Sequence, residues 1–199
     1  MRERLMQAAL ELMSIQGLKF TMSDLAREMG ISKRTIYEHF SSKEELIGSI
    51  VDQSIDEVIQ LEKGIYENPH WSSLEKLRRV LSIVPSGLKL SDQRLLAEMK
   101  RLAPNEWNKI NNYLQEECGW STVANIIEEG IAAGEIRPVH VPSVVQMMIG
   151  ASAALFDPEF LMRSSCTLQQ AVALMAETMT QGLAVPVSDA ETHTGDAHI

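Results

Sequence analysis

The 199-residue sequence is poor in the residues that build redox, metal and membrane proteins. Its two cysteines, Cys118 and Cys166, fit neither a Cys-x-x-Cys pair nor another zinc-ligand spacing. The histidines form no metal-ligand pattern with acids or cysteines, so we predict no metal and no cofactor. The longest apolar run, from Val144 to Phe156, is shorter than the roughly 20 residues that a membrane span requires.

The first residues lack the features of an export signal. Cations precede an apolar segment there, but Glu3, Gln7 and Glu11 recur on one side and make the segment amphipathic. Together with the scarcity of cysteine, this pattern predicts a cytoplasmic protein without a membrane anchor.

Strand-like alternation is also absent, and apolar residues recur at three and four spacing along most of the chain. The pattern predicts an all-α fold of about nine helices, with a possible break near Gly119 left open. Caps and breakers, such as Gly17, Ser42 and Pro104, mark the ends. The predicted helices are residues 3–16, 22–29, 33–39, 43–66, 72–84, 91–102, 105–133, 143–156 and 167–182.

Charge divides the chain into two parts. Residues 1–48 hold seven cations and seven acids, whereas the remaining residues hold 11 cations and 20 acids and so carry the whole net charge of -9. The division predicts two regions with different electrostatic roles, residues 1–45 and residues 46–183. Residues 184–199 are polar and acidic without apolar period, and we predict a disordered tail there.

The spacing of the second and third predicted helices indicates a helix-turn-helix. Only residues 30–32 separate them, which is the length of the turn in that motif. Gly30 permits the positive φ that ends the second helix, and Ala26 is small enough for the third helix to cross nearby. Ile36 and Phe40 are expected to face the core. The polar residues between them are left on the outside.

These outer residues suit double-stranded DNA. Arg34 can donate to the edge of guanine, and the methyl group of Thr35 can contact that of thymine. Phenol, imidazole and ammonium groups can donate to phosphates, which positions a helix without reading sequence. Glu38 is interpreted as a solvated residue. The predicted DNA-contact residues are Thr21, Ser32, Lys33, Arg34, Thr35, Tyr37, His39 and Lys43.

At these residues the sequence resembles the TetR/AcrR family of transcriptional regulators. The family's recognition helix ends in Tyr-x-x-Phe, here Tyr37 and Phe40, and a lysine, here Lys43, opens the next helix. The segment ANIIEEGIAAGEIRP also resembles the turn that precedes the family's last two helices. In the family those helices form the dimer interface. The resemblance implies a helix-turn-helix DNA-binding domain at residues 1–45 and a helical effector-binding and dimerisation domain at residues 46–183. The resemblance implies interface residues Val145, Met148, Ile149, Leu174, Met175 and Thr178.

The middle of the chain matches no motif, which is expected where such regulators diverge to fit different inducers. Its large aromatic residues could line a pocket for a small apolar or aromatic effector, although large aromatics are core residues first. The methionines of the last two predicted helices could likewise form an adaptable ligand surface or serve in packing, and their helical spacing favours packing. The candidate effector-contact residues are Trp71, Trp107, Tyr113 and Trp120.

The leading hypothesis is a homodimeric transcriptional repressor that a small-molecule effector releases from a palindromic operator. One alternative is a helix-turn-helix protein without effector that acts through protein contacts of its acidic region. Another is a helical carrier or enzyme with an incidental helix-turn-helix corner. The sequence contains no HExxH, GxSxG or glycine-rich phosphate loop, so we predict that the protein is not an enzyme.

Overall fold

The computed structural model describes residues 1–84, 93–115 and 117–185. Within these ranges the chain forms eleven α-helices and one 3-10 helix, and the only β feature is an isolated bridge between Ile136 and Ala184. The predicted all-α class is confirmed. Of the predicted tail, residues 186–199 lie outside the described residues.

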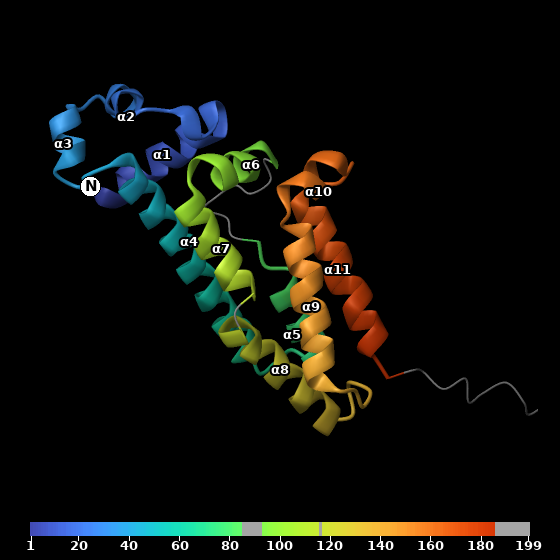
Figure 1. Cartoon of the computed structure of the whole chain (residues 1–199). Helices are drawn as coiled ribbons and strands as arrows, with labels where there is room; N and C mark the ends of the chain where they lie inside the picture. The colour runs from blue at the N-terminus through green and yellow to red at the C-terminus, as the bar shows by residue number, and fades with distance from the viewer. Residues whose placement is uncertain (85–92, 116, 186–199) are drawn as a thin grey trace, which may run out of the picture.

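The N-terminal region is a compact set of short helices (Figure 1). They are α1 (Arg2–Gln16), the 3-10 helix η1 (Gly17–Lys19), α2 (Met22–Met29) and α3 (Lys33–Tyr37). Their apolar faces meet in one core, where Leu25, Ile36 and Phe40 are completely buried. The predicted inward positions of Ile36 and Phe40 are thus confirmed.

Helix α4 (Lys43–Tyr66) connects this region to the rest of the molecule (Figure 1). It starts at Ser42, whose hydroxyl accepts a hydrogen bond from the Glu45 amide at 3.1 Å. At 24 residues it is about 36 Å long, given a rise of 1.5 Å per residue. One helix therefore runs from the helix-turn-helix to the far end of the molecule.

The remaining helices pack along α4 and beside one another (Figure 1). Helices α9 and α11 lie side by side at the edge opposite α4. The elements are α5 (Ser73–Leu81), α6 (Gln93–Leu102), α7 (Pro104–Gln115), α8 (Glu117–Ala132), α9 (Val141–Leu155), α10 (Pro158–Arg163) and α11 (Leu168–Leu183).

Several predicted boundaries differ from the structure. The predicted helix at residues 105–133 is described as two helices, α7 and α8. Helix α10 was not predicted, although Asp157 followed by Pro158 is a start signal: the Asp157 carboxylate accepts from the Glu159 amide at 3.2 Å. The recognition helix ends at Tyr37 rather than residue 39, because the His39 and Phe40 amides both turn back to the Ile36 carbonyl.

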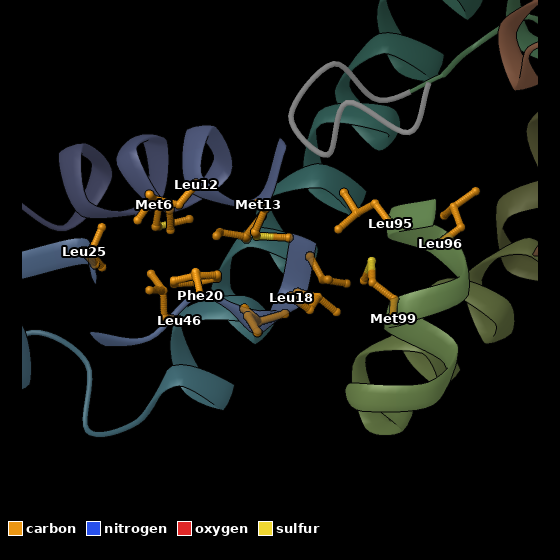
Figure 2. Packing of buried hydrophobic residues seen from close by; sticks show 14 of the residues in the cluster. Met6, Leu12, Met13, Leu18, Phe20, Leu25, Leu46, Leu95, Leu96 and Met99 are labelled. Atoms are coloured by element: carbon orange, nitrogen blue, oxygen red, sulfur yellow. The ribbon is translucent and has the colours of Figure 1, made fainter. Parts of the chain in front are cut away.

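Two apolar clusters stabilise the fold. The first extends from α1–α4 to α6, where Leu95 and Met99 lie beside Leu18 (Figure 2). This cluster crosses the predicted domain boundary at residues 45 and 46, so the two regions share a core. The second cluster joins α5, α8, α9 and α11 around Leu77 and Ile126.

Candidate DNA-binding surface and effector cavity

The turn between α2 and α3 has the geometry that its sequence predicts. Gly30 adopts φ 64° and ψ 30°, a left-handed conformation that favours glycine. The Gly30 amide donates to Arg27 at 3.2 Å, and the Ile31 amide donates to the Ala26 carbonyl at 3.0 Å. This arrangement ends α2 and redirects the chain into α3.

Two hydroxyls fix the start of α3. The Ser32 Oγ accepts from the Thr35 amide at 3.1 Å, and the two hydroxyl oxygens lie 3.0 Å apart. Ser32 therefore caps the helix as predicted. Both hydroxyls already have a partner within the protein, so their contacts with DNA remain a prediction.

The cations of α3 point into solvent. Lys33 is exposed, and the Arg34 side chain has 90% of its surface accessible. Arg34 Nε lies 3.4 Å from Oε1 of Glu38, one turn later on the same face. An exposed pair of this kind is weak, so Arg34 is available to exchange Glu38 for a base edge.

Tyr37 and His39 lie at the end of α3. Tyr37 is 50% exposed, while His39 is half-buried. The His39 carbonyl accepts a hydrogen bond from Arg2 Nη1 at 2.6 Å. Arg2 also stacks on the Phe40 ring at 4.0 Å and donates to Ser49 at 2.8 Å. Sequence reasoning missed this role of Arg2 because the contact spans 37 residues.

Thr21 and Lys43 both make internal contacts. The Thr21 hydroxyl donates to the Asp24 carboxylate at 2.7 Å, and Thr21 hydrogen bonds hold the pKa of Asp24 below its ordinary value. The Lys43 ammonium donates to the Leu18 carbonyl and lies 4.5 Å from the centre of the Phe20 ring. Burial lowers the pKa of Lys43. In this structure Lys43 holds α4 against η1, and a phosphate contact stays a prediction.

An apolar cavity lies between α4 and the helices packed against it. Its volume is about 100 Å³, and α4, α5, α7, α8, α9 and α11 all contribute to its walls. Most of the lining side chains are aliphatic or aromatic. The lining residues are Val51, Ser54, Ile55, Val58, Glu62, Val80, Leu81, Ile83, Ile110, Tyr113, Leu114, Trp120, Val123, Ser152, Phe156, Val172 and Met175.

Two of the four predicted effector residues line this cavity, namely Tyr113 and Trp120. Trp71 instead stacks under Arg79 at 4.0 Å, and Trp107 packs against the first core cluster. Neither lines this cavity, and an effector contact of these two residues stays a prediction. Spacing along the chain could not separate these cases, because Trp71 lies in the bend before α5 and the other three lie on helices whose packing partners are distant in the sequence.

Glu62 is the cavity residue that sequence reasoning missed. Burial raises the pKa of its carboxyl from 4.5 to about 7, although a hydrogen bond from Tyr113 acts in the opposite direction. A signal was present in the sequence. Glu62 follows Ile55 by seven positions and Val58 by four, which places it on the inner face of α4.

The predicted interface residues divide between the surface and the core. Leu174 is 66% exposed and Thr178 is also exposed, whereas Val145 is half-buried. Met148 and Ile149 pack inside the subunit, and the half-buried Met175 lines the cavity. Met147 of α9, which the prediction did not include, is 67% exposed. The interface role of the six predicted residues stays a prediction.

The fold and this surface define a helix-turn-helix DNA-binding protein whose remaining residues form a C-terminal helical region. Residues 5–50 match the family described as bacterial regulatory proteins, tetR family. The chain is 32% identical to the uncharacterized HTH-type transcriptional regulator YvaF of Bacillus subtilis, over 92% of this chain and 95% of that protein. The chain therefore belongs to the TetR family of transcriptional regulators, which is not a family of enzymes.

Solved structures share the fold. A TetR/AcrR regulator from Thermobifida fusca has a TM-score of 0.66 at 21% identity, with 91% of this chain and 97% of that chain covered. The Bacillus subtilis regulator FadR in complex with stearoyl-CoA has a TM-score of 0.58 at 22% identity, with coverage of 91% and 98%.

Among the described residues, none of the helices combines the length and the apolar character that a membrane span requires.

Proposed function

We propose that this DNA-binding regulator is a homodimeric repressor that a small molecule releases from a palindromic operator. The observation that carries the proposal is that α4 connects two features. The exposed recognition helix α3 comes just before its first residue, and the apolar cavity lies against its later turns. Lys33, Arg34 and Tyr37 face solvent at one end of the molecule, and α4 leads from that end to the cavity wall at Val51 and Val58. Residues 1–45 would bind DNA, and residues 46–183 would bind effector and partner subunit.

Dimerisation would use the outer face of α9 and α11. Met147 and Leu174 expose two thirds of their surface there, and Ala154 and Thr178 are exposed beside them on the same helices. Large exposed apolar side chains on neighbouring helices are typical of an interface. A two-fold pair would present two recognition helices to successive major grooves, about 34–36 Å apart.

Release would follow from the small size of the cavity. A volume of about 100 Å³ is below the roughly 300–1,000 Å³ of clefts that hold drug-sized ligands. An effector of ordinary size would therefore extend out of this space or move α4 away from α7, α8 or α9. Because α4 carries the helix-turn-helix at its other end, that movement would change the separation of the two recognition helices. The effector shifts the equilibrium only as far as it binds the two states differently.

Similarity to known regulators supports an effector of this general kind. The FadR structure contains stearoyl-CoA, and another structural neighbour at a TM-score of 0.57 is the ketosteroid regulator KstR2 of Mycobacterium tuberculosis. These two regulators support the proposal of a small-molecule site within the shared fold. The second candidate is a regulator that acts through protein contacts alone. The excess of acids in residues 49–199 favours it, because an acidic surface can bind a basic partner protein.

The test begins with selection of operator sequences from a random duplex library by the full-length protein, followed by footprinting. The proposal predicts a palindromic site with half-sites one helical turn apart and a dimer in sedimentation. Screening metabolites for thermal stabilisation, then for release of the selected duplex, tests the effector. A non-palindromic site bound by a monomer would contradict the repressor dimer. Operator binding that no stabilising compound alters would favour the second candidate.

A further inference from the structure

The cavity has a single charged group in its wall. Among the described lining residues Glu62 is the one carboxyl, and none is lysine, arginine or histidine. The carboxyl therefore faces an apolar space without a cation of the protein beside it. Such a group is costly to ionise unless a ligand supplies the opposite charge.

The other polar side chains of the wall differ from Glu62. Ser54 donates to the Ile50 carbonyl of its own helix at 2.9 Å, and Ser152 donates to the Met175 sulfur at 3.7 Å. Both hydroxyls are turned to neighbours within the protein. The polar end of the cavity thus consists of Glu62 and Tyr113, contributed by α4 and α7.

Titratable groups of α4, α7 and α8 belong to separate pairs, among them Lys63, the residue after Glu62, which pairs with Glu67 at 3.9 Å. One helical turn beyond Glu62, Tyr66 donates to Glu129 of α8 at 2.6 Å. Toward the other end of α4, Lys109 of α7 pairs with Asp52 at 2.9 Å and with Glu106 at 3.1 Å. Burial raises the pKa of Glu62 to about 7 and the Tyr113 hydrogen bond opposes this shift. Near neutral pH, a cationic ligand would therefore favour the ionised carboxylate and an uncharged ligand the protonated form.

We propose that the cavity binds a molecule with an apolar body and one protonated amine, which pairs with the Glu62 carboxylate and lies beside the Tyr113 hydroxyl. This inference rests on the proposed function and names the effector's chemical class. A carboxylate or phosphate ligand would place a second negative charge beside Glu62 with no cation to balance it. The excess of 20 acids over 11 cations in residues 49–199 also attracts cations toward this region.

A matched series of probes tests the class. Phenylbutylamine, phenylbutanol and phenylbutyrate share one apolar body and differ only in an ammonium, hydroxyl or carboxylate head. Calorimetric titration of the full chain is expected to give the order amine, alcohol, carboxylate at about pH 8, with the amine at least about tenfold tighter than the alcohol. Amine affinity is expected to fall as pH is lowered through about 7, because Glu62 becomes protonated. Alcohol affinity should not fall.

Variants isolate the carboxyl. Glu62→Gln keeps the shape of the side chain and is expected to remove the pH dependence and to weaken amine binding about tenfold or more. Asp56→Asn is the control, because Asp56 is exposed on the same helix and does not line the cavity. The proposal is overturned if the alcohol or carboxylate binds as tightly as the amine, if no amine binding is detected, or if Glu62→Gln and Asp56→Asn behave alike. The wild-type pH profile decides the question even if Glu62→Gln does not fold.

Operator release separates this inference from the proposed function. Amine binding that depends on Glu62 but leaves the protein on its operator would uphold the ligand class and contradict effector-released repression. Release by uncharged or anionic compounds, with no preference for amines, would uphold the repressor and overturn the ligand class.

Discussion

The Glu98 carboxylate accepts a hydrogen bond from the Leu18 amide at 2.6 Å, which ties α6 to η1 of the DNA-binding region. Gly17, just before this amide, has φ 64° and ψ -158°, a conformation restricted almost entirely to glycine. Leu95 and Met99 of the same helix lie beside Leu18 in the first apolar cluster (Figure 2). The helix-turn-helix is thus attached to the C-terminal helices at α6 as well as through α4.

Removing this attachment should destabilise the protein. Glu98→Ala leaves the Leu18 amide of a buried residue without its charged acceptor, and we expect the free energy of unfolding to fall by about 1–3 kcal/mol. Urea denaturation measures it. Glu28→Ala is the control, because Glu28 is an exposed acid of α2. Equal effects of the two substitutions would show that the Glu98 contact contributes no stability.

Gly30 can be tested against a second glycine. Gly30→Ala must place a side chain at φ 64°, and we expect a loss of roughly 1–2 kcal/mol in unfolding free energy. Gly64→Ala, within α4, should instead stabilise by about 0.5–1 kcal/mol. An added Cβ meets nothing within 4 Å at either position, so the backbone alone explains the difference. A gain at both positions in thermal or chemical denaturation would contradict this account.

Glu38 should oppose DNA binding. It is the acid that pairs with Arg34 on the exposed face of α3, and Glu38→Gln both frees Arg34 and removes a negative charge near phosphate. We expect operator affinity to rise about twofold to fivefold at low salt, with a smaller gain at high salt. Anisotropy titrations at two salt concentrations measure this.

The control for Glu38 is Glu67→Gln, which removes the acid of a similar exposed pair with Lys63 at the far end of α4. It should leave operator affinity unchanged. A loss of affinity in Glu38→Gln would mean that Glu38 reads a base rather than repelling phosphate.

The charge of Glu62 makes stability depend on pH. Because the folded state raises its pKa to about 7, the folded protein binds this proton more tightly than the unfolded chain, and stability is lost as pH rises from about 4.5 through 7. Without ligand, Glu62→Gln should increase the free energy of unfolding by about 1–2 kcal/mol at pH 8 and much less near pH 5. Denaturation at the two pH values measures the difference, with Asp56→Asn as the control.

The helix-turn-helix was predictable because its signals are local. Caps at Thr21 and Ser32, the glycine at residue 30 and the spacing of Ile36 and Phe40 all act within a few residues. The same holds for the exposure of Lys33, Arg34 and Tyr37. Their contacts with DNA are still predictions.

Contacts between distant segments were not predictable in the same way. Lys43 donates to the Leu18 carbonyl and lies over the Phe20 ring, which no local pattern reveals. Arg2 donates to the His39 carbonyl and to the Ser49 hydroxyl, which are also distant in the sequence. The same applies to the cavity. Trp71 lies in the bend before α5 and Trp120 lies on α8, and only the packing of segments that are distant in the sequence decides that Trp120 lines the cavity while Trp71 lies against Arg79. The exposure of Met147 beside the buried Met148 on α9 likewise depends on packing, because both are methionines in one apolar segment.

The most direct test of the central claim is fluorescence anisotropy of the selected operator duplex with wild type, the double variant Arg34→Ala and Tyr37→Ala, and the control Lys63→Ala, at about 0.15 M salt. Arg34 and Tyr37 are exposed on α3, so the double variant should keep the fold, as circular dichroism can verify. We predict that it loses about 30-fold or more in operator affinity while Lys63→Ala is unaffected. A folded double variant that binds the operator as tightly as wild type would contradict the assignment of α3 as the DNA-reading helix.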